Sequence, residues 1–208
     1  MTQFDALITE LSAVGEQAVA RGLVLATGGN LSARHPGGDE FVVTGSGTYL
    51  DSLRPSDFTV MNLAGEILAG DAQPSSEWKL HQRTYRACPE VNAVVHVHPQ
   101  YSVLLDLLGY PIRLLTQDHA YYVGSVGTTP FYPNGSDELA DSAAEQSREH
   151  PCVILGHHGS SCVGPDIAMA FRRALNLEEA GAATYRALLL GDTTSQFPRE
   201  KWDVLRHA

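Results

Sequence analysis

The chain has 208 residues, of which 43% are hydrophobic and 18% charged, a composition that excludes disordered and fibrous proteins. Its length predicts a single domain over residues 1–208, large enough to bury a core without disulfides. The formal charge of −10 argues against a nucleic-acid partner. We expect a cytoplasmic protein without a membrane partner, because no apolar run is long enough to span a bilayer and the acidic N-terminus does not resemble a secretory signal.

Helices and short strands alternate along the predicted chain. Apolar residues recur at helical spacing over 4–21, and short apolar runs bounded by Gly, Pro and Asp then predict strands. Helices on both sides of a mixed sheet predict an α/β fold with three α/β/α layers. The expected strands are 31–34, 41–44, 58–63, 91–98 and 152–156, and the expected later helices are 76–87, 99–108, 137–149 and 166–190.

The strongest chemical signal is the run VVHVHP, in which His96 and His98 are two residues apart on an apolar strand. Alternate side chains leave a strand on the same face, with Cα atoms roughly 6.6 Å apart. A lone histidine in a strand is usually a hydrogen-bonded core residue, whereas two on one face near a strand end favour a metal site. Imidazole nitrogens suit zinc, iron or copper.

A second histidine pair, His157 and His158, precedes Gly159 where the strand at 152–156 runs into a turn. Either histidine could supply a third ligand. Three protein ligands with an open fourth position are typical of a catalytic metal. The alternative is a glycine-containing turn with two ordinary histidines.

The segment PSSEW places Ser75, Ser76 and Glu77 where a helix is expected to begin. Two hydroxyls, free N–H groups and the helix dipole form a candidate anion site. Glu77 either stabilises the first helical turn, as acidic residues commonly do, or acts as an acid/base beside the metal. His81, one turn further on, is either a rival ligand or a histidine on the helix surface.

Two glycine-containing loops, TGGN at 27–30 and TGSG at 44–47, are candidate cradles for phosphate oxygens. Glycine permits positive φ and a close approach of the backbone to an anion, although ordinary turns use the same residues. Neither loop matches the GxGxxG or Walker A pattern, so the sequence does not support nucleotide binding.

In chain order, GLVLATGGNLSAR, FVVTGSGTYL, PSSEWKLH, PEVNAVVHVHP and VILGHHGSSCVG resemble the class II aldolase/adducin family, and within it the L-fuculose-phosphate aldolase branch. The resemblance implies a mainly antiparallel mixed sheet. It also implies a zinc-dependent lyase, with Mn²⁺ or Co²⁺ as possible replacements, that cleaves a phosphorylated sugar. The substrate is a ketose 1-phosphate, cut to dihydroxyacetone phosphate and an aldehyde through a zinc-stabilised enediolate. A homotetramer with active sites between subunits is implied as well.

The family's motifs also assign roles to particular residues. The resemblance implies that His96, His98 and His158 bind the metal and that Glu77 is the catalytic acid/base. The phosphate-binding positions that it implies are Thr27, Asn30, Ser46, Gly47, Ser75 and Ser76.

One segment departs from the family's aldolases, which place a tyrosine from a neighbouring subunit near residue 115. Here the segment reads LLTQDHAYYVG, with Asp118 and His119 in that place and Tyr121 and Tyr122 several positions later. The departure keeps a pentulose-phosphate 4-epimerase, a dehydratase or a decarboxylase of the same scaffold as alternatives to the lyase. A non-catalytic, adducin-like interaction module is a third hypothesis, against which the metal-binding residues argue.

Overall fold

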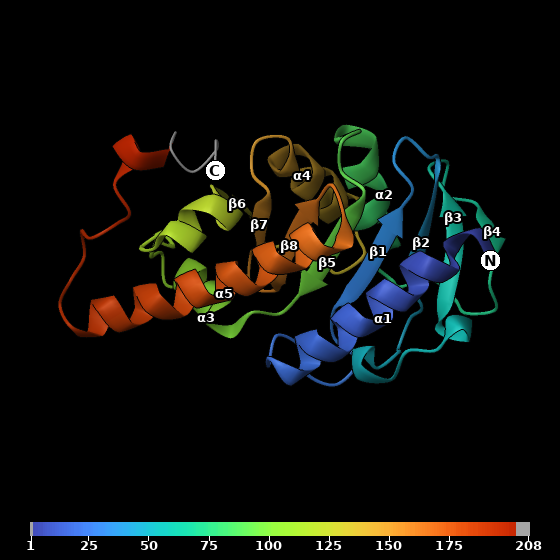
Figure 1. Cartoon of the computed structure of the whole chain (residues 1–208), viewed down its shortest axis with the longest axis horizontal. Coiled ribbons are helices and arrows are strands. Elements are labelled where there is room, and N and C mark those ends of the chain that lie inside the picture. Colours follow the sequence, from blue (N-terminus) through green and yellow to red (C-terminus); the bar gives the residue numbers. More distant parts are fainter. Residues whose placement is uncertain (1, 203–208) are drawn as a thin grey trace.

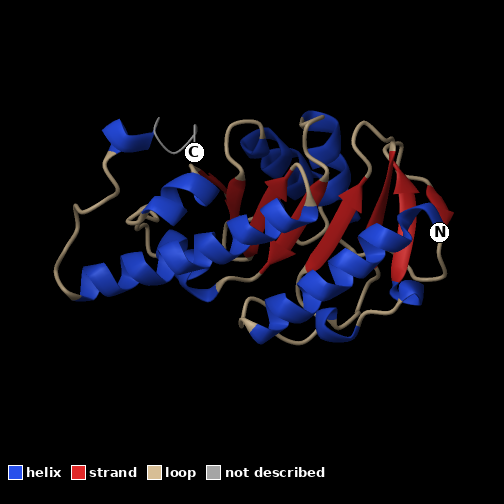
Figure 2. Cartoon of the chain, viewed as in Figure 1, coloured by secondary structure: helices blue, strands red, loops and turns tan. Residues whose placement is uncertain are grey.

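The computed structural model describes residues 2–202 and contains one central sheet, drawn in red in Figure 2. The sheet has eight strands in the order β4-β3-β2-β1-β5-β8-β7-β6. Every neighbouring pair in this sheet is antiparallel except β6 and β7, so the expected mixed, mainly antiparallel sheet is confirmed. The strands are β1 (Asn30–Arg34), β2 (Glu40–Thr44), β3 (Phe58–Asn62), β4 (Ile67–Ala69), β5 (Ala93–Val97), β6 (Val126–Thr129), β7 (Cys152–Leu155) and β8 (Gly159–Gly164).

Helices cover both faces of the sheet and complete the expected three layers (Figure 1). On one face α1 packs against β1 and α5 against β5 and β8, whereas α4 packs against β6 and β7 on the other face, together with α2. None of the helices within residues 2–202 combines the length and apolar character that a bilayer crossing requires. The helices are α1 (Asp5–Ala20), α2 (Trp78–Ala87), α3 (Gln100–Leu107), α4 (Asp137–Ser147) and α5 (Ile167–Leu189), with 3₁₀ turns at Thr2–Phe4, Leu50–Ser52, Pro55–Asp57 and Arg199–Lys201 and a π-helical segment η4 (His119–Val123).

Each helix and strand expected from the sequence is present, with its ends displaced by at most two residues. The strand expected at 91–98 ends at Val97, so His98 lies just beyond it. Glu77 precedes α2 as its N-cap residue, which corrects its expected position in the first turn. The sequence did not indicate β4, β6, β8 or η4.

The central strand β5 determines which side chains reach the α2 side of the sheet. Val95 packs into the core beneath α1 and α5, and Val94 packs into the core on the α2 side. His96 therefore points to the α2 side, since side chains alternate along a strand. Asn30 of β1 and Ser161 of β8 lie directly opposite His96 in the sheet. Three polar residues paired across neighbouring strands, Asn30, His96 and Ser161, thus lie next to the segment that precedes α2.

Candidate active site

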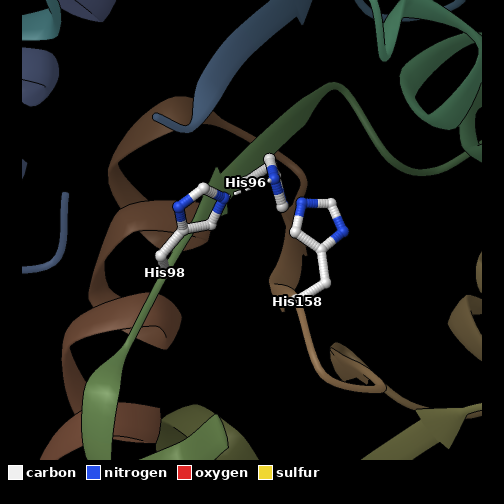
Figure 3. A group of neighbouring side chains, drawn as sticks. All are labelled: His96, His98 and His158. Carbon is white, nitrogen blue, oxygen red and sulfur yellow. Dashed lines mark hydrogen bonds between the residues drawn. The ribbon is translucent and has the colours of Figure 1, made fainter. Parts of the chain in front are cut away.

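Three histidines converge at the C-terminal end of β5 (Figure 3): His96 lies in β5, His98 just after it and His158 in the β7–β8 turn. Their candidate ligand atoms all lie within 4.8 Å of one another, and the His96 and His98 Nε2 atoms are 3.2 Å apart. The centroid of the His158 ring is 4.9 Å from that of His96 and 5.2 Å from that of His98. The structure therefore brings together the three residues that were predicted as metal ligands.

The geometry of this histidine cluster fits a metal ion. Four-coordinate zinc has Zn–N distances of about 2.0–2.1 Å, which sets neighbouring ligand nitrogens roughly 3.4 Å apart. His96 Nδ1 donates to the Ser160 carbonyl at 2.9 Å, so the lone pair of the neutral ring is on Nε2, facing the other histidines. Burial and the neighbouring His96 and His158 lower the pKa of His98 to about 4, which keeps its imidazole in the neutral form that a metal needs.

Glu77 lies against the cluster and carries a buried oxygen without a partner. Glu77 Oε2 accepts from Asn30 Nδ2 at 2.9 Å and is 3.0 Å from His96 Nε2. Glu77 Oε1 is 3.6 Å from His158 Nε2 and, among the described residues, has no hydrogen-bond partner, although it is buried. Burying a carboxylate oxygen without a partner costs folding free energy, and a cation held by the histidines would offset that cost. This oxygen is the observation that most supports the fit of a metal here.

The electrostatics of the pair formed by Glu77 and His96 favour the charged carboxylate. Burial opposes the ionisation of Glu77, but without a metal the protonated form of His96, which can donate from Nε2, outweighs burial and holds the pKa of Glu77 well below its usual value. Burial likewise opposes protonation of His96, and the charge of Glu77 outweighs it and raises the pKa of His96. Glu77 is therefore a carboxylate at neutral pH.

A cavity of about 90 Å³ opens beside Glu77, His98 and His158. The loops before β1, after β2 and before α2 contribute most of its wall, and within residues 2–202 no Lys or Arg lines it. His96 is fully buried beneath it. All six residues predicted to bind phosphate border this cavity: Thr27, Asn30, Ser46, Gly47, Ser75 and Ser76.

Backbone contacts explain why these loops meet. Gly45 and Pro74 form an isolated β-bridge, and the Ser75 N–H donates to the Thr44 carbonyl at 3.0 Å, which ties PSSE to TGSG. In TGGN, a Cβ on Gly29 would lie 2.8 Å from the His96 carbonyl oxygen, and Gly29 has a φ of 71°. Glycine is therefore required where this loop crosses the end of β5.

The six predicted phosphate residues differ in how their side chains are engaged. Thr27, Ser46 and Ser76 are exposed, whereas Asn30 and Ser75 are buried beside Glu77. Ser75 Oγ accepts from the Glu77 N–H at 3.2 Å, which leaves its own hydroxyl proton available for a ligand. The two buried residues thus also hold Glu77.

Two features of the site differ from the sequence expectations or were missed by them. Asn134 borders the cavity, and in the sequence it has no signal beyond a polar turn. His81 is fully buried, with both ring nitrogens in hydrogen bonds to Ser32 and Asn30, so it is neither a surface histidine nor placed as a ligand. Residues 116–122 do not border the cavity of their own subunit, and their action from a neighbouring subunit stays a prediction.

Gly159 provides a test of the histidine geometry. A Cβ at this position would lie 2.6 Å from His98 Cδ2, 2.6 Å from the Val97 carbonyl and 3.0 Å from His96 Cε1. Changing Gly159→Ala is expected to displace both rings and weaken metal binding about 10–100-fold, the usual cost of disturbing the support of metal ligands. Titration of the metal-free protein with Zn²⁺ measures the effect.

The matched control is Gly164→Ala at the other end of β8, where the Cβ would meet the backbone of α5 at Ala170 instead. This variant is expected to lower the melting temperature without changing metal affinity. Equal losses of metal affinity in both variants would show that general destabilisation of β8 is responsible.

Comparison with known proteins places the chain in a family. Residues 9–185 match the family described as Class II Aldolase and Adducin N-terminal domain, and the chain belongs to this family. It is 30% identical over 183 residues to a 5-deoxy-D-ribulose 1-phosphate aldolase of Bacillus thuringiensis, covering 88% of this chain and 86% of that protein. It is 33% identical over 170 residues to an L-fuculose phosphate aldolase of Methanocaldococcus jannaschii, covering 82% of this chain and 91% of that protein.

The fold agrees with this assignment. A solved structure titled L-fuculose 1-phosphate aldolase superimposes with a TM-score of 0.90 and 26% identity, covering 98% of this chain and 95% of that one. The expected resemblance to the family is therefore confirmed.

Proposed function

We propose that this protein is a metal-dependent aldehyde-lyase that cleaves a ketose 1-phosphate to dihydroxyacetone phosphate and an aldehyde. The observation that carries the proposal is the shared cavity, because Glu77, His98 and His158 border the same small space as six uncharged candidate phosphate ligands. The names of the two relatives, aldolases of 5-deoxy-D-ribulose 1-phosphate and of L-fuculose phosphate, support a phosphorylated ketose as the substrate class.

His96, His98 and His158 would hold the metal, and we propose zinc because imidazole ligands suit it, with Mn²⁺ or Co²⁺ as alternatives. A divalent ion held there would supply Lewis-acid charge for the oxyanion that develops as the C3–C4 bond breaks. Glu77 Oε1 faces the histidines and has no hydrogen-bond partner among residues 2–202, which supports it as the atom that exchanges the proton at C3.

The phosphate would be held by the residues that border the cavity, through hydroxyl and backbone donors rather than through cations. The N-terminus of α2 adds the positive end of a helix dipole beside Ser75 and Ser76. Binding at this remote group fixes the reacting bond over the histidines, which lowers the entropic part of the barrier.

Replacing Ser76 with alanine tests this assignment. Ser76 is exposed at the cavity wall, so its loss should remove a donor to phosphate without disturbing the core. A hydrogen bond to a charged group contributes about 1.5–3 kcal/mol, so KM for the phosphorylated ketose should rise roughly tenfold or more with metal content unchanged. The unphosphorylated ketose is the control, and an equal rise in its KM would remove Ser76 from the phosphate site.

The segment 116–122 bears on the alternative activities and on the oligomer. His119 is buried, with Nε2 paired with Glu179 and Nδ1 accepting from the Leu115 N–H, so neither nitrogen is free for a substrate. This arrangement gives no support to a catalytic role for His119. We propose a homotetramer in which a neighbouring subunit supplies the residue that exchanges the proton of the leaving hydroxyl. Sedimentation analysis of the purified protein would test the tetramer.

A further inference from the structure

A row of buried polar side chains runs from Glu77 into the interior between β1 and α2, and of its members only Asn30 borders the cavity. Asn30 and Ser32 are two apart on β1 and share a face, and His81 and Tyr85 are four apart on α2 and share a face. The two pairs meet between strand and helix. The exposed fractions are 4% for Asn30, 0% for Ser32 and His81, and 1% for Tyr85, so water does not compete for their hydrogen bonds.

These side chains form one continuous chain of hydrogen bonds that ends on Glu77. The oxygens of Tyr85 and Ser32 are 2.6 Å apart, and Ser32 Oγ is 2.6 Å from His81 Nδ1. His81 Nε2 is 2.5 Å from Asn30 Oδ1, and Asn30 Nδ2 is 2.9 Å from Glu77 Oε2.

The orientation of the Asn30 amide determines the direction of every donor in this row. Asn30 Nδ2 donates to Glu77 Oε2 at 2.9 Å, so Asn30 Oδ1 faces His81 and accepts from it. His81 must then carry its proton on Nε2 and accept on Nδ1 from the Ser32 hydroxyl. Ser32 has one proton, so Tyr85 must donate to Ser32. Burial and the nearby His96 lower the pKa of His81 to about 3, which agrees with a neutral ring.

We infer that His81 is a positioning residue that acts on Glu77 through Asn30, an inference that rests on the proposed function. The Nε2–H tautomer of His81 fixes the Asn30 amide, which in turn holds Glu77 Oε2 and leaves Oε1 turned toward His158 without a partner. Without this hold the Asn30 amide can rotate by half a turn and present its oxygen to the carboxylate. Glu77 would then be repelled from the position that proton transfer at C3 requires.

Two amide variants of His81 separate positioning from packing. Glutamine reaches as far as His81 Nε2 and can donate to Asn30 Oδ1, whereas asparagine is too short to reach it. His81→Gln should therefore keep kcat within a few-fold of the wild type. His81→Asn should lower kcat about 10–100-fold, the usual cost of losing support for a catalytic group, while KM and metal content stay unchanged.

The tautomer of His81 is measured directly by ¹⁵N NMR of the wild-type protein, without metal and with Zn²⁺ bound. We expect one protonated nitrogen, Nε2, in both states. A Nδ1–H tautomer or an imidazolium would overturn the inference, as would equal kcat in the two variants or a loss of metal that accounts for the fall in kcat. If His81→Asn does not fold, the tautomer alone decides.

The two measurements also separate this inference from the proposed function. An inactive wild-type protein that shows the Nε2–H tautomer would contradict the aldolase reaction and leave the hydrogen-bonded row intact. An active aldolase with the other tautomer would contradict the row alone.

Discussion

Replacing Glu77 with glutamine is expected to lower kcat by about 10²–10⁴-fold, the usual contribution of a general acid or base. Glutamine keeps the shape of the side chain but cannot exchange a proton with carbon. Because the histidines are untouched, the metal content should remain close to that of the wild type. In the wild type Asn30 Nδ2 donates to Glu77 Oε2 at 2.9 Å, and the amide oxygen of the glutamine in the variant can accept the same hydrogen bond.

The isotope experiment for this variant isolates the proton transfer. Wild-type protein should exchange the C3 proton of dihydroxyacetone phosphate with solvent deuterium, and Glu77→Gln should not. Exchange at the wild-type rate in the variant would show that another residue moves the proton. Asp118 and Tyr121 of a neighbouring subunit would then be the first candidates.

The second large effect is expected from the two adjacent histidines of the β7–β8 turn. Changing His158→Asn removes one of three imidazoles whose nitrogens converge within 4.8 Å. Removing a residue that only supports a metal ligand weakens metal binding about 10–100-fold. Removing the ligand itself should therefore weaken metal binding by more than about 100-fold. Metal analysis after dialysis should show little bound zinc, and activity should fall in parallel.

The matched control is His157→Asn, the same substitution one residue earlier. His157 is exposed, lies outside the histidine cluster and has a φ of 59°, a conformation that asparagine tolerates. This variant should retain metal and activity. If His157→Asn loses the metal and His158→Asn keeps it, the third ligand is His157 and the assignment of His158 is wrong.

The sequence predicts best where its pattern is regular. The apolar run of β5, with valines on both faces, indicated a buried strand, and the spacing of His96 and His98 indicated a shared site. The strand β8 was missed because its sequence, GSSCVG, has the small residues of a loop. These residues are needed there, since a Cβ on Gly159 would meet both His96 and His98.

Long-range contacts explain the other differences. From the sequence of α2 alone, His81 could lie on the surface or in the interior. Its buried position depends on a hydrogen-bond partner, Ser32, that is 49 residues away on β1. Asn134 reaches the cavity because Gly135, with a φ of 72°, lets the turn pack against Ser76, where a Cβ would lie 2.5 Å from the Ser76 carbonyl. Neither contact has a signature in a single sequence.

The central claim is tested most directly by the product formed from phosphorylated ketoses. The zinc-loaded protein is incubated with a ketose 1-phosphate or with a pentulose 5-phosphate, and dihydroxyacetone phosphate is quantified with and without a chelator. We predict its release from the 1-phosphate alone, its loss with the chelator and its return when Zn²⁺ is added. Epimerisation of the 5-phosphate with no dihydroxyacetone phosphate from the 1-phosphate would contradict the proposed lyase.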